Sequence, residues 1–366
     1  MENSKVRIAY FVHGLSGGVG SVLINYIDML PKSRYEFDVI TLYIESDDLY
    51  RKFTSRGINV IKIPSKSESI IKNIYSMYRI LGKKKYDIAH AHMTLTNCFP
   101  LFIAWTRGIK IRVSHSHLAE KSTLYTNILA CLTRIVANVY LACGKSAGRF
   151  LYGNRRFEIL NNAVDLKKYR YNIKMREAQR KLLGIKDSTI LFGNVGRFSK
   201  QKNHTFLIDI FKEIHSKNKD TKLILIGDGE LEEEIKNKIV ENKLEQAVIF
   251  TGAITNVYEV MQAIDILIMP SLFEGLSIAA IEAQANGIKC VFSDTVDSDT
   301  KVIDDVKFLS LNDSVEKWAN TALELAKYPK KDESKIISER GYDLSKEGKK
   351  LGEIYQRELS KLLREK

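Results

Sequence analysis

Short runs of β-branched and apolar residues alternate with helix-length segments along the whole chain. These runs cover residues 6–12, 37–43, 58–63, 87–91, 110–114 and 138–142 in the first half, and residues 189–195, 222–227, 247–251, 265–269, 288–292 and 306–309 in the second. Such alternation is typical of parallel, doubly wound sheets with helices on both faces. The sequence therefore predicts an α/β fold with two Rossmann-like sheets.

The length of the chain, 366 residues, indicates two domains of comparable size, because it exceeds what one typical core accommodates. We predict an N-terminal Rossmann-like domain over residues 1–170 and a C-terminal one over residues 171–344. An amphipathic helix over residues 345–366 is expected to pack back on the first domain. Ligands of such sheets bind at the carboxyl ends of the strands, so we expect the site in a cleft between facing domains.

The net charge of +13 is concentrated in the first half of the chain. Residues 1–170 carry 26 Lys and Arg against 12 Asp and Glu, whereas residues 171–366 carry 31 against 32. A basic surface on one domain indicates an anionic partner. Because no recognised nucleic-acid module is visible, we expect a membrane surface or a pyrophosphate-linked lipid and not nucleic acid.

No apolar run approaches the roughly 18 to 20 residues that span a bilayer, and the amino terminus leads straight into the first predicted strand. We therefore expect a cytoplasmic protein and not a secreted one. A peripheral position on the inner face of the plasma membrane is a separate expectation, which rests on the basic first half. Residues 66–85 combine apolar and basic side chains at helical spacing, which suits a sheet-packing helix or, as the less favoured alternative, an interfacial membrane helix. The four cysteines lack CxxC spacing and are expected to be buried free thiols.

Two glutamates, Glu274 and Glu282, lie eight residues apart across a predicted loop-to-helix junction. With the helix beginning near residues 275–277, Glu274 precedes it and Glu282 lies on its second turn. The backbone N–H groups of residues 276–278, together with the helix dipole, form a site suited to an anion. A nucleotide sugar, with phosphates between two hydroxyl-bearing groups, fits this arrangement. The alternative is a capped surface helix with two solvated glutamates.

Two further loops follow predicted strands. Residues 14–21 are rich in glycine, which allows a close backbone approach to a phosphate or sugar, although they match neither GxGxxG nor the Walker pattern and also suit a plain tight turn. Arg197 and Lys202 follow the first strand of the second half. An arginine and a lysine together suit a diphosphate leaving group, and a solvated basic loop is the alternative.

Two pairs of histidines occupy predicted strand ends, His90 with His92 and His115 with His117. Residues i and i+2 of a strand share a face, so four histidines in this pattern allow a metal site. No correctly spaced carboxylate or cysteine completes such a site. We therefore predict no metal, and expect one histidine to hydrogen bond a substrate hydroxyl while its neighbours pack.

Several short motifs follow one another in order: GGVG, RVSHSH, CGKSAGRFLYG, ILNNAVD, NVGRFSKQKN, IGDGEL and FEGLSIAAIEAQANG. Together they resemble the retaining glycosyltransferases of family 4, which have the GT-B fold, over nearly the whole chain. The SHSH, QKNH and EAQANG segments are most similar to bacterial capsule and exopolysaccharide glycosyltransferases. Ala163, Asn203 and Ser277 replace residues that are usually Gly, Gly and Pro, and no charged group is lost.

In the second domain, the resemblance implies a site for a nucleotide-sugar donor. Arg197 and Lys202 would hold the diphosphate, Glu282 the ribose hydroxyls and Glu274 the sugar hydroxyls. The nucleobase would lie near residues 251–255. Backbone amides that would help hold the phosphates and sugar belong to Gly275, Leu276, Ser277 and Ile278.

In the first domain, the resemblance implies that Gly17 and Gly18 close over the donor. His117 is similar to the histidine that reaches the transferring sugar, and His115 is the less favoured candidate. His117, Glu274, Arg197 and Lys202 are thus the expected catalytic group.

The implied reaction moves a sugar from a nucleotide-diphosphate donor, with UDP preferred over GDP, to a hydroxyl of a lipid-linked acceptor, with retention at the anomeric carbon. Basic groups would act by stabilising charge on the departing diphosphate, so no metal or cofactor is expected. Three alternatives remain: a GT-B epimerase or phosphorylase, a non-catalytic partner subunit, and a metal hydrolase that uses the histidine pairs.

Overall fold

The computed structural model describes residues 5–15, 17–118 and 122–364, and it divides the chain into two compact units. The first unit ends at Ala163 and resumes at Leu344, and the second is Val164–Asp343. Val164 already belongs to the second unit because it forms a parallel bridge with Asp343, and its N–H donates to the carbonyl of Tyr342 at 3.0 Å. The second unit thus begins before the predicted boundary at residue 170.

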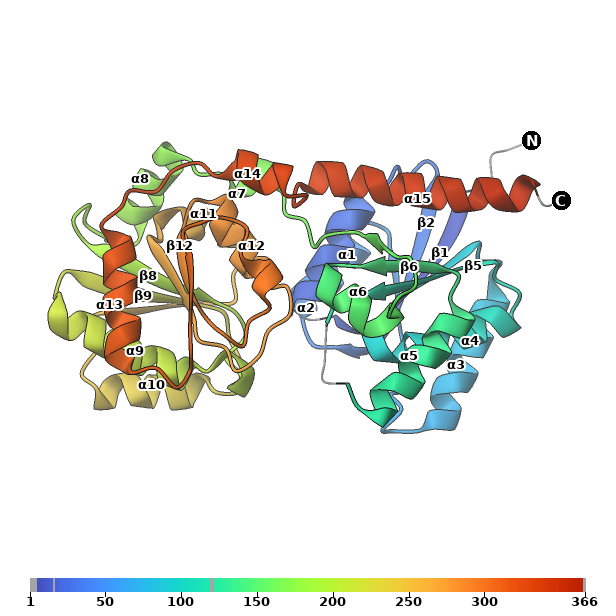
Figure 1. The fold of residues 1–366 in the computed structure, drawn as a ribbon, viewed down its shortest axis with the longest axis horizontal. Helices are drawn as coiled ribbons and strands as arrows, with labels where there is room; N and C mark the ends of the chain where they lie inside the picture. The colour runs from blue at the N-terminus through green and yellow to red at the C-terminus, as the bar shows by residue number, and fades with distance from the viewer. Residues whose placement is uncertain (1–4, 16, 119–121, 365–366) are drawn as a thin grey trace. The chain divides into compact units, whose positions relative to one another are not determined.

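The first unit contains a parallel sheet of seven strands in the order β3-β2-β1-β4-β5-β6-β7 (Figure 1). Its strands are β1 (Val6–Leu15), β2 (Tyr35–Ile44), β3 (Asn59–Lys62), β4 (Ile88–His92), β5 (Ile111–Ser116), β6 (Val139–Ala142) and β7 (Glu158–Ile159). Its helices are α1 (Gly17–Met29), α2 (Asp47–Thr54), α3 (Ile70–Lys83), η1 (Thr94–Asn97), α4 (Cys98–Thr106), α5 (Leu124–Val136), α6 (Lys145–Tyr152) and α15 (Leu344–Arg364).

The second unit contains a parallel sheet of six strands in the order β10-β9-β8-β11-β12-β13. Its strands are β8 (Ile190–Val195), β9 (Thr221–Ile226), β10 (Val248–Gly252), β11 (Ile266–Met269), β12 (Lys289–Ser293) and β13 (Val306–Leu309). Its helices are α7 (Leu166–Tyr169), α8 (Ile173–Leu182), η2 (Lys200–Lys202), α9 (His204–Lys217), α10 (Glu232–Glu241), α11 (Val257–Ala263), α12 (Ile278–Ala285), η3 (Ser298–Thr300), α13 (Val315–Ala326) and α14 (Ser334–Glu339).

The predicted α/β fold with two doubly wound parallel sheets is confirmed, and every predicted strand is found. The end of β1 differs most from its prediction, because the strand continues to Leu15 and not only to residue 12. β7 was not predicted. Its two residues are too few to show a strand pattern in the sequence.

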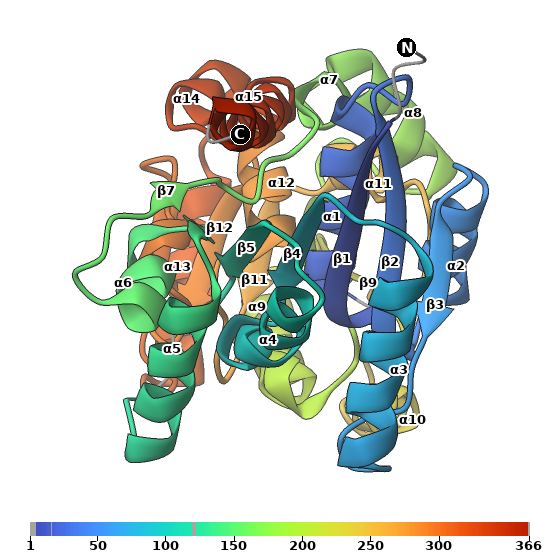
Figure 2. The same ribbon diagram turned by 90° about the vertical axis from the view of Figure 1, so that its right-hand side faces the viewer.

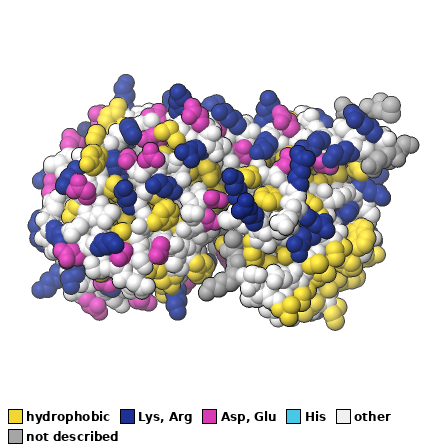
Figure 3. Space-filling model, viewed as in Figure 1, with side chains coloured by type: hydrophobic (Ala, Val, Ile, Leu, Met, Phe, Trp, Pro, Cys, Tyr) yellow, Lys and Arg dark blue, Asp and Glu magenta, His cyan; other side chains and the backbone are white. Residues whose placement is uncertain are grey.

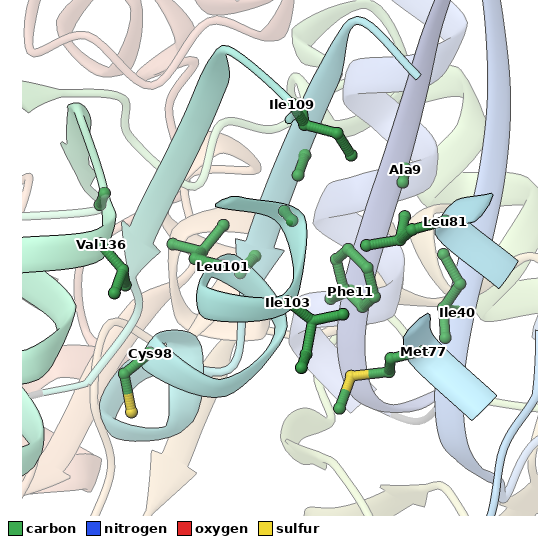
Figure 4. Close-up of a cluster of buried hydrophobic side chains, with 14 of the residues drawn as sticks. Ala9, Phe11, Ile40, Met77, Leu81, Cys98, Leu101, Ile103, Ile109 and Val136 are labelled. Atoms are coloured by element: carbon green, nitrogen blue, oxygen red, sulfur yellow. The ribbon is translucent and has the colours of Figure 1, made fainter. Parts of the chain in front are cut away.

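The two faces of the first sheet are covered by different helices (Figure 2). On one face, Phe11 of β1 packs with Met77 of α3 and Leu101 of α4 in a buried cluster that also includes residues of α5 (Figure 4). On the other face, the Tyr10 hydroxyl of β1 lies 2.8 Å from the Tyr355 hydroxyl of α15. The alternation of Tyr10 and Phe11 follows from the two-residue period of a strand.

Helix α15 packs against α1 in the first unit. The contact is close at Gly348, where a Cβ atom would lie 2.3 Å from the Cβ atom of Met29. The carboxylate of Glu347 accepts a hydrogen bond from the backbone N–H of Asn161 at 2.8 Å. Among the described residues, no helix has the length and apolar composition needed to cross a membrane.

Candidate functional site

A lysine and a glutamate meet at the carboxyl edge of the second sheet. β8 and β11 are neighbours in this sheet, Lys202 lies in η2 after β8, and Glu274 follows β11. The Nζ atom of Lys202 lies 2.5 Å from Oε1 of Glu274, and their side chains are only 15% and 12% exposed. Gln201 donates its Nε2 hydrogen to the same carboxylate oxygen at 3.2 Å. The two predicted site residues, Lys202 and Glu274, therefore form one partly buried polar cluster with Gln201, which was not predicted.

Hydrogen bonds fix the two loops that carry this cluster. The backbone N–H of Leu272 donates to the Gln201 carbonyl at 2.8 Å, and Gln201 Nε2 donates to the Phe273 carbonyl at 3.0 Å. Asn203 Nδ2 donates to the carbonyl of Pro270 at 3.1 Å. Asn203 has a φ of 57°, in the left-handed region that favours glycine and tolerates asparagine. This conformation suits asparagine at position 203 and would also suit glycine.

Glycines allow the loops after β8 and β9 to contact each other. A Cβ atom on Gly227, whose φ is 141°, would lie 2.1 Å from the carbonyl oxygen of Gly196. A Cβ atom on Gly196 would lie 2.8 Å from Cε of Lys202. The Lys202 side chain therefore runs directly over Gly196, and a larger residue there would displace it.

Arg197 lies in a different environment from Lys202. Its Nε atom lies 3.1 Å from Oε2 of Glu230, and both side chains are more than half exposed. Exposed ion pairs of this kind contribute little to stability. Arg197 and Lys202, predicted as one diphosphate-binding pair, thus each contact a carboxylate of their own. Glu230 lies within the IGDGEL motif, but nothing in the sequence paired it with Arg197.

Glu282 lies on the second turn of α12, as predicted from the helix start. Burial raises the pKa of its carboxyl from 4.5 to about 7, and a hydrogen bond with Tyr169 limits the rise. Burial and the Glu282 carboxyl together raise the pKa of the Tyr169 hydroxyl. Tyr169, at the end of α7, was not predicted, because it precedes Glu282 by more than a hundred residues and no motif contains both.

The segment between the two glutamates leads into α12. Gly275 is partly exposed, whereas Leu276 and Ser277 are buried. Ser277 is the N-cap residue, and its side chain makes no capping hydrogen bond. The first N–H groups of a helix have no partner within that helix and carry partial positive charge. Such N–H groups and a lysine are groups that bind phosphate, and at this edge of the sheet Lys202 is paired with Glu274.

The predicted glycine loop of residues 14–21 is wrong in its secondary structure. β1 continues to Leu15 and α1 begins at Gly17, so Gly17, Gly18 and Gly20 belong to the first turns of a helix. A Cβ atom on Gly20 would lie 3.1 Å from Cδ1 of Leu49 in α2, so this glycine allows close helix packing. Ser16 lies outside the described residues.

The two histidine pairs come together inside the first unit, on the adjacent strands β4 and β5 and directly after β5. His92 Nδ1 lies 2.8 Å from His117 Nε2, and His90 Nδ1 lies 2.6 Å from the hydroxyl of Tyr355. All four rings are buried, and His117, at 8% exposure, is more accessible than His115 at 0%. Nδ1 of His117 and Oδ1 of Asn162 are both buried and have no hydrogen-bond partner among the described residues.

Burial makes the four histidines poor bases. It lowers the pKa of His117 to about 4, against the opposing effect of the Asn162 side chain. Burial and the neighbouring imidazoles lower the pKa of His90, His92 and His115 well below 6.5. The cluster is therefore neutral at physiological pH.

Neutral imidazoles are also metal ligands. One ring nitrogen from each of His90, His92 and His115 lies within 4.8 Å of the others. The alternative of a histidine metal site thus has a geometric basis, and metal independence stays a prediction.

The cysteines were expected to be buried free thiols. Cys98, Cys143 and Cys290 are buried free thiols, but Cys131 is exposed because it faces outward from α5.

The sequence profile of the family "Glycosyl transferases group 1" matches residues 175–343. Across most of its length, the chain is also similar to curated glycosyltransferases. It is 29% identical to the putative glycosyltransferase EpsF of Bacillus subtilis, over 94% of each chain. It is 32% identical to the N-acetylgalactosamine-N,N'-diacetylbacillosaminyl-diphospho-undecaprenol 4-alpha-N-acetylgalactosaminyltransferase of Campylobacter jejuni, over 79% of this chain and 80% of that protein. The chain belongs to the group 1 family of glycosyltransferases.

Another relative is the UDP-Gal:alpha-D-GlcNAc-diphosphoundecaprenol alpha-1,3-galactosyltransferase of Escherichia coli, with 28% identity over 80% of each chain. Among solved structures, Anabaena Alr3699/HepE in complex with UDP and glucose superposes with a TM-score of 0.77 at 16% identity, covering 96% of this chain and 99% of that one. This likeness establishes the GT-B fold.

Proposed function

We propose that the protein is a retaining glycosyltransferase of family 4 that uses a UDP-linked sugar. The acceptor is a saccharide linked through pyrophosphate to a polyprenyl lipid, and the product is a precursor of capsule, exopolysaccharide or another cell-surface polysaccharide. Support for the donor comes from the UDP complex of the structural neighbour, and support for the acceptor from the names of the two diphosphoundecaprenol-specific relatives. The enzyme works on the inner face of the plasma membrane.

The Lys202–Glu274 pair is the observation that carries this proposal. A cation and a carboxylate 2.5 Å apart, beside the N-terminus of α12, offer both an anion site and a hydrogen-bond acceptor for a sugar hydroxyl. When the donor binds, its phosphate takes over part of the interaction that Lys202 makes with Glu274. The Glu274 carboxylate then accepts hydrogen bonds from the sugar.

The reaction forms a bond between the acceptor oxygen and the anomeric carbon and breaks the bond from that carbon to the diphosphate. The acceptor proton passes to an oxygen of the departing diphosphate. Lys202, Arg197 and the first amides of α12 stabilise the negative charge that builds up there. Glu282 accepts hydrogen bonds from the ribose hydroxyls.

In the first unit, His117 is the residue we assign to the transferring sugar. Because its pKa is about 4, it is neutral at physiological pH and acts as a hydrogen-bond partner and not as a charged acid. Gly17 and Gly18 close over the donor from the start of α1. The enzyme needs neither a metal nor another cofactor.

The test is incubation of the purified protein with a panel of nucleotide sugars and a synthetic polyprenyl diphosphosaccharide. We expect release of UDP and a lipid product that carries one more sugar, with α stereochemistry from an α-linked donor and with equal rates in EDTA. Release of an epimerised donor or consumption of free phosphate, without a lipid product, would identify an epimerase or phosphorylase instead. Loss of activity in EDTA would point to the histidine metal site.

A further inference from the structure

Helices α3, α4 and α5 of the first unit carry large apolar side chains on their outer surfaces. Figure 3 shows these side chains gathered over the part of the first unit where Figure 1 places the three helices. We call this surface the apolar face. Its members with at least 40% exposure are Ile70, Ile71, Ile74, Tyr75, Tyr78, Phe102, Trp105, Leu124, Tyr125, Ile128, Leu132 and Ile135.

These side chains lie on the outer sides of the helices and not on the sides that pack on the sheet. In α3, Met77 and Leu81 pack on the sheet, while Ile71 and Tyr75 point outward one turn apart. In α5, Leu129 faces the core. The outward apolar residues of α5 again follow helical spacing, and they are Leu124, Ile128, Leu132 and Ile135. Exposed apolar residues gathered on the outer sides of neighbouring helices, in addition to those that pack on the core, mark an interaction surface.

The apolar face is continuous across the three helices. α4 lies between α3 and α5 and contacts both. The guanidinium of Arg107, just after α4, lies 4.3 Å from the centre of the Tyr78 ring of α3. The rings of Phe102 and Trp105 are in edge-to-face contact, with centroids 6.2 Å apart. The exposed side chains therefore form one surface and not three separate ridges.

The charges around this face select the kind of partner. Glu68 is the one acidic residue in segments 66–85, 98–110 and 122–136 of the sequence. Among the described residues, no carboxylate pairs with the exposed Lys72, Arg79 or Lys83, whereas the neighbouring Lys84 pairs with Asp38 at 2.9 Å and Glu36 at 3.5 Å. The basic residues of the three segments are Lys66, Lys72, Arg79, Lys83, Lys84, Lys85, Arg107, Lys110 and Arg134.

We infer that the apolar face docks on an anionic lipid bilayer, with its apolar side chains in the interfacial region and its basic residues at the lipid headgroups. A symmetric dimer through this face would place the same basic residues against each other, which opposes self-association. The inference deepens the proposed function, on which it rests for the lipid-linked acceptor, by naming the surface that meets the membrane.

Tryptophan fluorescence tests the docking directly, because the chain has two tryptophans in opposite environments. Trp105 lies on the apolar face and is 52% exposed, whereas Trp318 is fully buried in the second unit. With vesicles of phosphatidylcholine and phosphatidylglycerol, we expect a blue shift of the emission and quenching by brominated lipid. Vesicles of phosphatidylcholine alone, or high salt, should strongly reduce both signals.

The matched variants use apolar residues of similar exposure. Ile71→Ser and Leu124→Ser, at 81% and 80% exposure, should together weaken vesicle binding about tenfold or more with little effect on folding. Leu182→Ser in the second unit and Leu363→Ser at the end of α15, at 78% and 74%, are controls that should bind normally.

Equal vesicle binding by the double variant and the controls would overturn the inference. So would a wild-type dimer in analytical ultracentrifugation that Ile71→Ser and Leu124→Ser convert to monomer, without any vesicle binding. The vesicles contain neither donor nor acceptor, so these outcomes are independent of whether the protein transfers sugar.

Discussion

At the scale of single residues, Glu282 links the stability of the second unit to pH. Because burial raises its pKa from 4.5 to about 7, the fold favours the protonated form. The protonated Glu282 carboxyl therefore contributes fully to the stability of the folded state below about pH 4.5. This contribution is lost as the pH rises through 7.

We therefore expect Glu282→Gln to stabilise the second unit relative to wild type at pH 8, by about 2 kcal/mol, and to have little effect at pH 4.5. Urea unfolding at the two pH values, followed by hydrogen exchange in the second unit, measures the difference. An effect of the same size at both pH values would show that Glu282 does not titrate in this range.

Asn203 is expected to tolerate glycine but not valine. Both substitutions remove the hydrogen bond to the Pro270 carbonyl, but only valine is strained at a φ of 57°. Asn203→Val should therefore unfold more easily than Asn203→Gly, by about 1–2 kcal/mol. Equal stability of the two variants in thermal unfolding would contradict the left-handed conformation.

The sequence indicates the positions of Lys202, Glu274 and Glu282 well, because each follows from where a strand ends or a helix begins. It does not reveal their partners. Glu230 and Tyr169 are brought to Arg197 and Glu282 by packing of distant segments, which leaves no pattern in the sequence. The ion pair between Lys202 and Glu274 likewise depends on β8 and β11 being neighbours in the sheet.

At the scale of elements, β4 and β5 bring neutral histidines together in the first unit. Because the folded state lowers the pKa of His117 to about 4, its contribution to stability is full above pH 6.5 and is lost as the pH falls toward 4. The pKa values of His90, His92 and His115 are also lowered, so their contributions to stability are likewise lost as the pH falls.

His117→Gln should reduce the acid sensitivity of the first unit, by about 2–3 kcal/mol between pH 6.5 and pH 4. His13→Gln, at an exposed position at the end of β1, is the control and should leave that sensitivity unchanged. The acid-unfolding midpoint measures both variants. An equal shift of the midpoint in the two would rule out a special role for the buried cluster.

Element types were predictable where the two-residue and helical periods were clear, as for the β1 to β6 strands. The loop prediction for residues 14–21 is wrong, because glycine is common in loops, whereas Gly20 lies in α1 and allows close approach to Leu49 of α2. β7 could not be predicted, because a strand of two residues is too short to show a two-residue period.

At the scale of the whole molecule, the last helix belongs to the first unit although its sequence follows the second. Tyr355 anchors it, through contacts of its hydroxyl with Tyr10 and His90. Tyr355→Ala should destabilise the first unit by roughly 3 kcal/mol or more and leave the second unit unchanged.

Hydrogen exchange resolved along the chain measures this effect, and Tyr328→Ala, at a site 60% exposed in the second unit, is the control. Faster exchange in both units for Tyr355→Ala would show that they unfold together.

The proposed roles of Lys202 at the diphosphate and of Glu274 at the sugar are tested most directly by the rate of UDP release from the UDP-sugar that the wild type uses. Lys202→Ala and Glu274→Ala should each lower kcat/KM by about a hundredfold or more while retaining the wild-type Tm within a few degrees. Lys200→Ala, at an exposed position in the same short helix, should retain the wild-type rate. Unchanged rates in both Lys202→Ala and Glu274→Ala would contradict the proposed donor site.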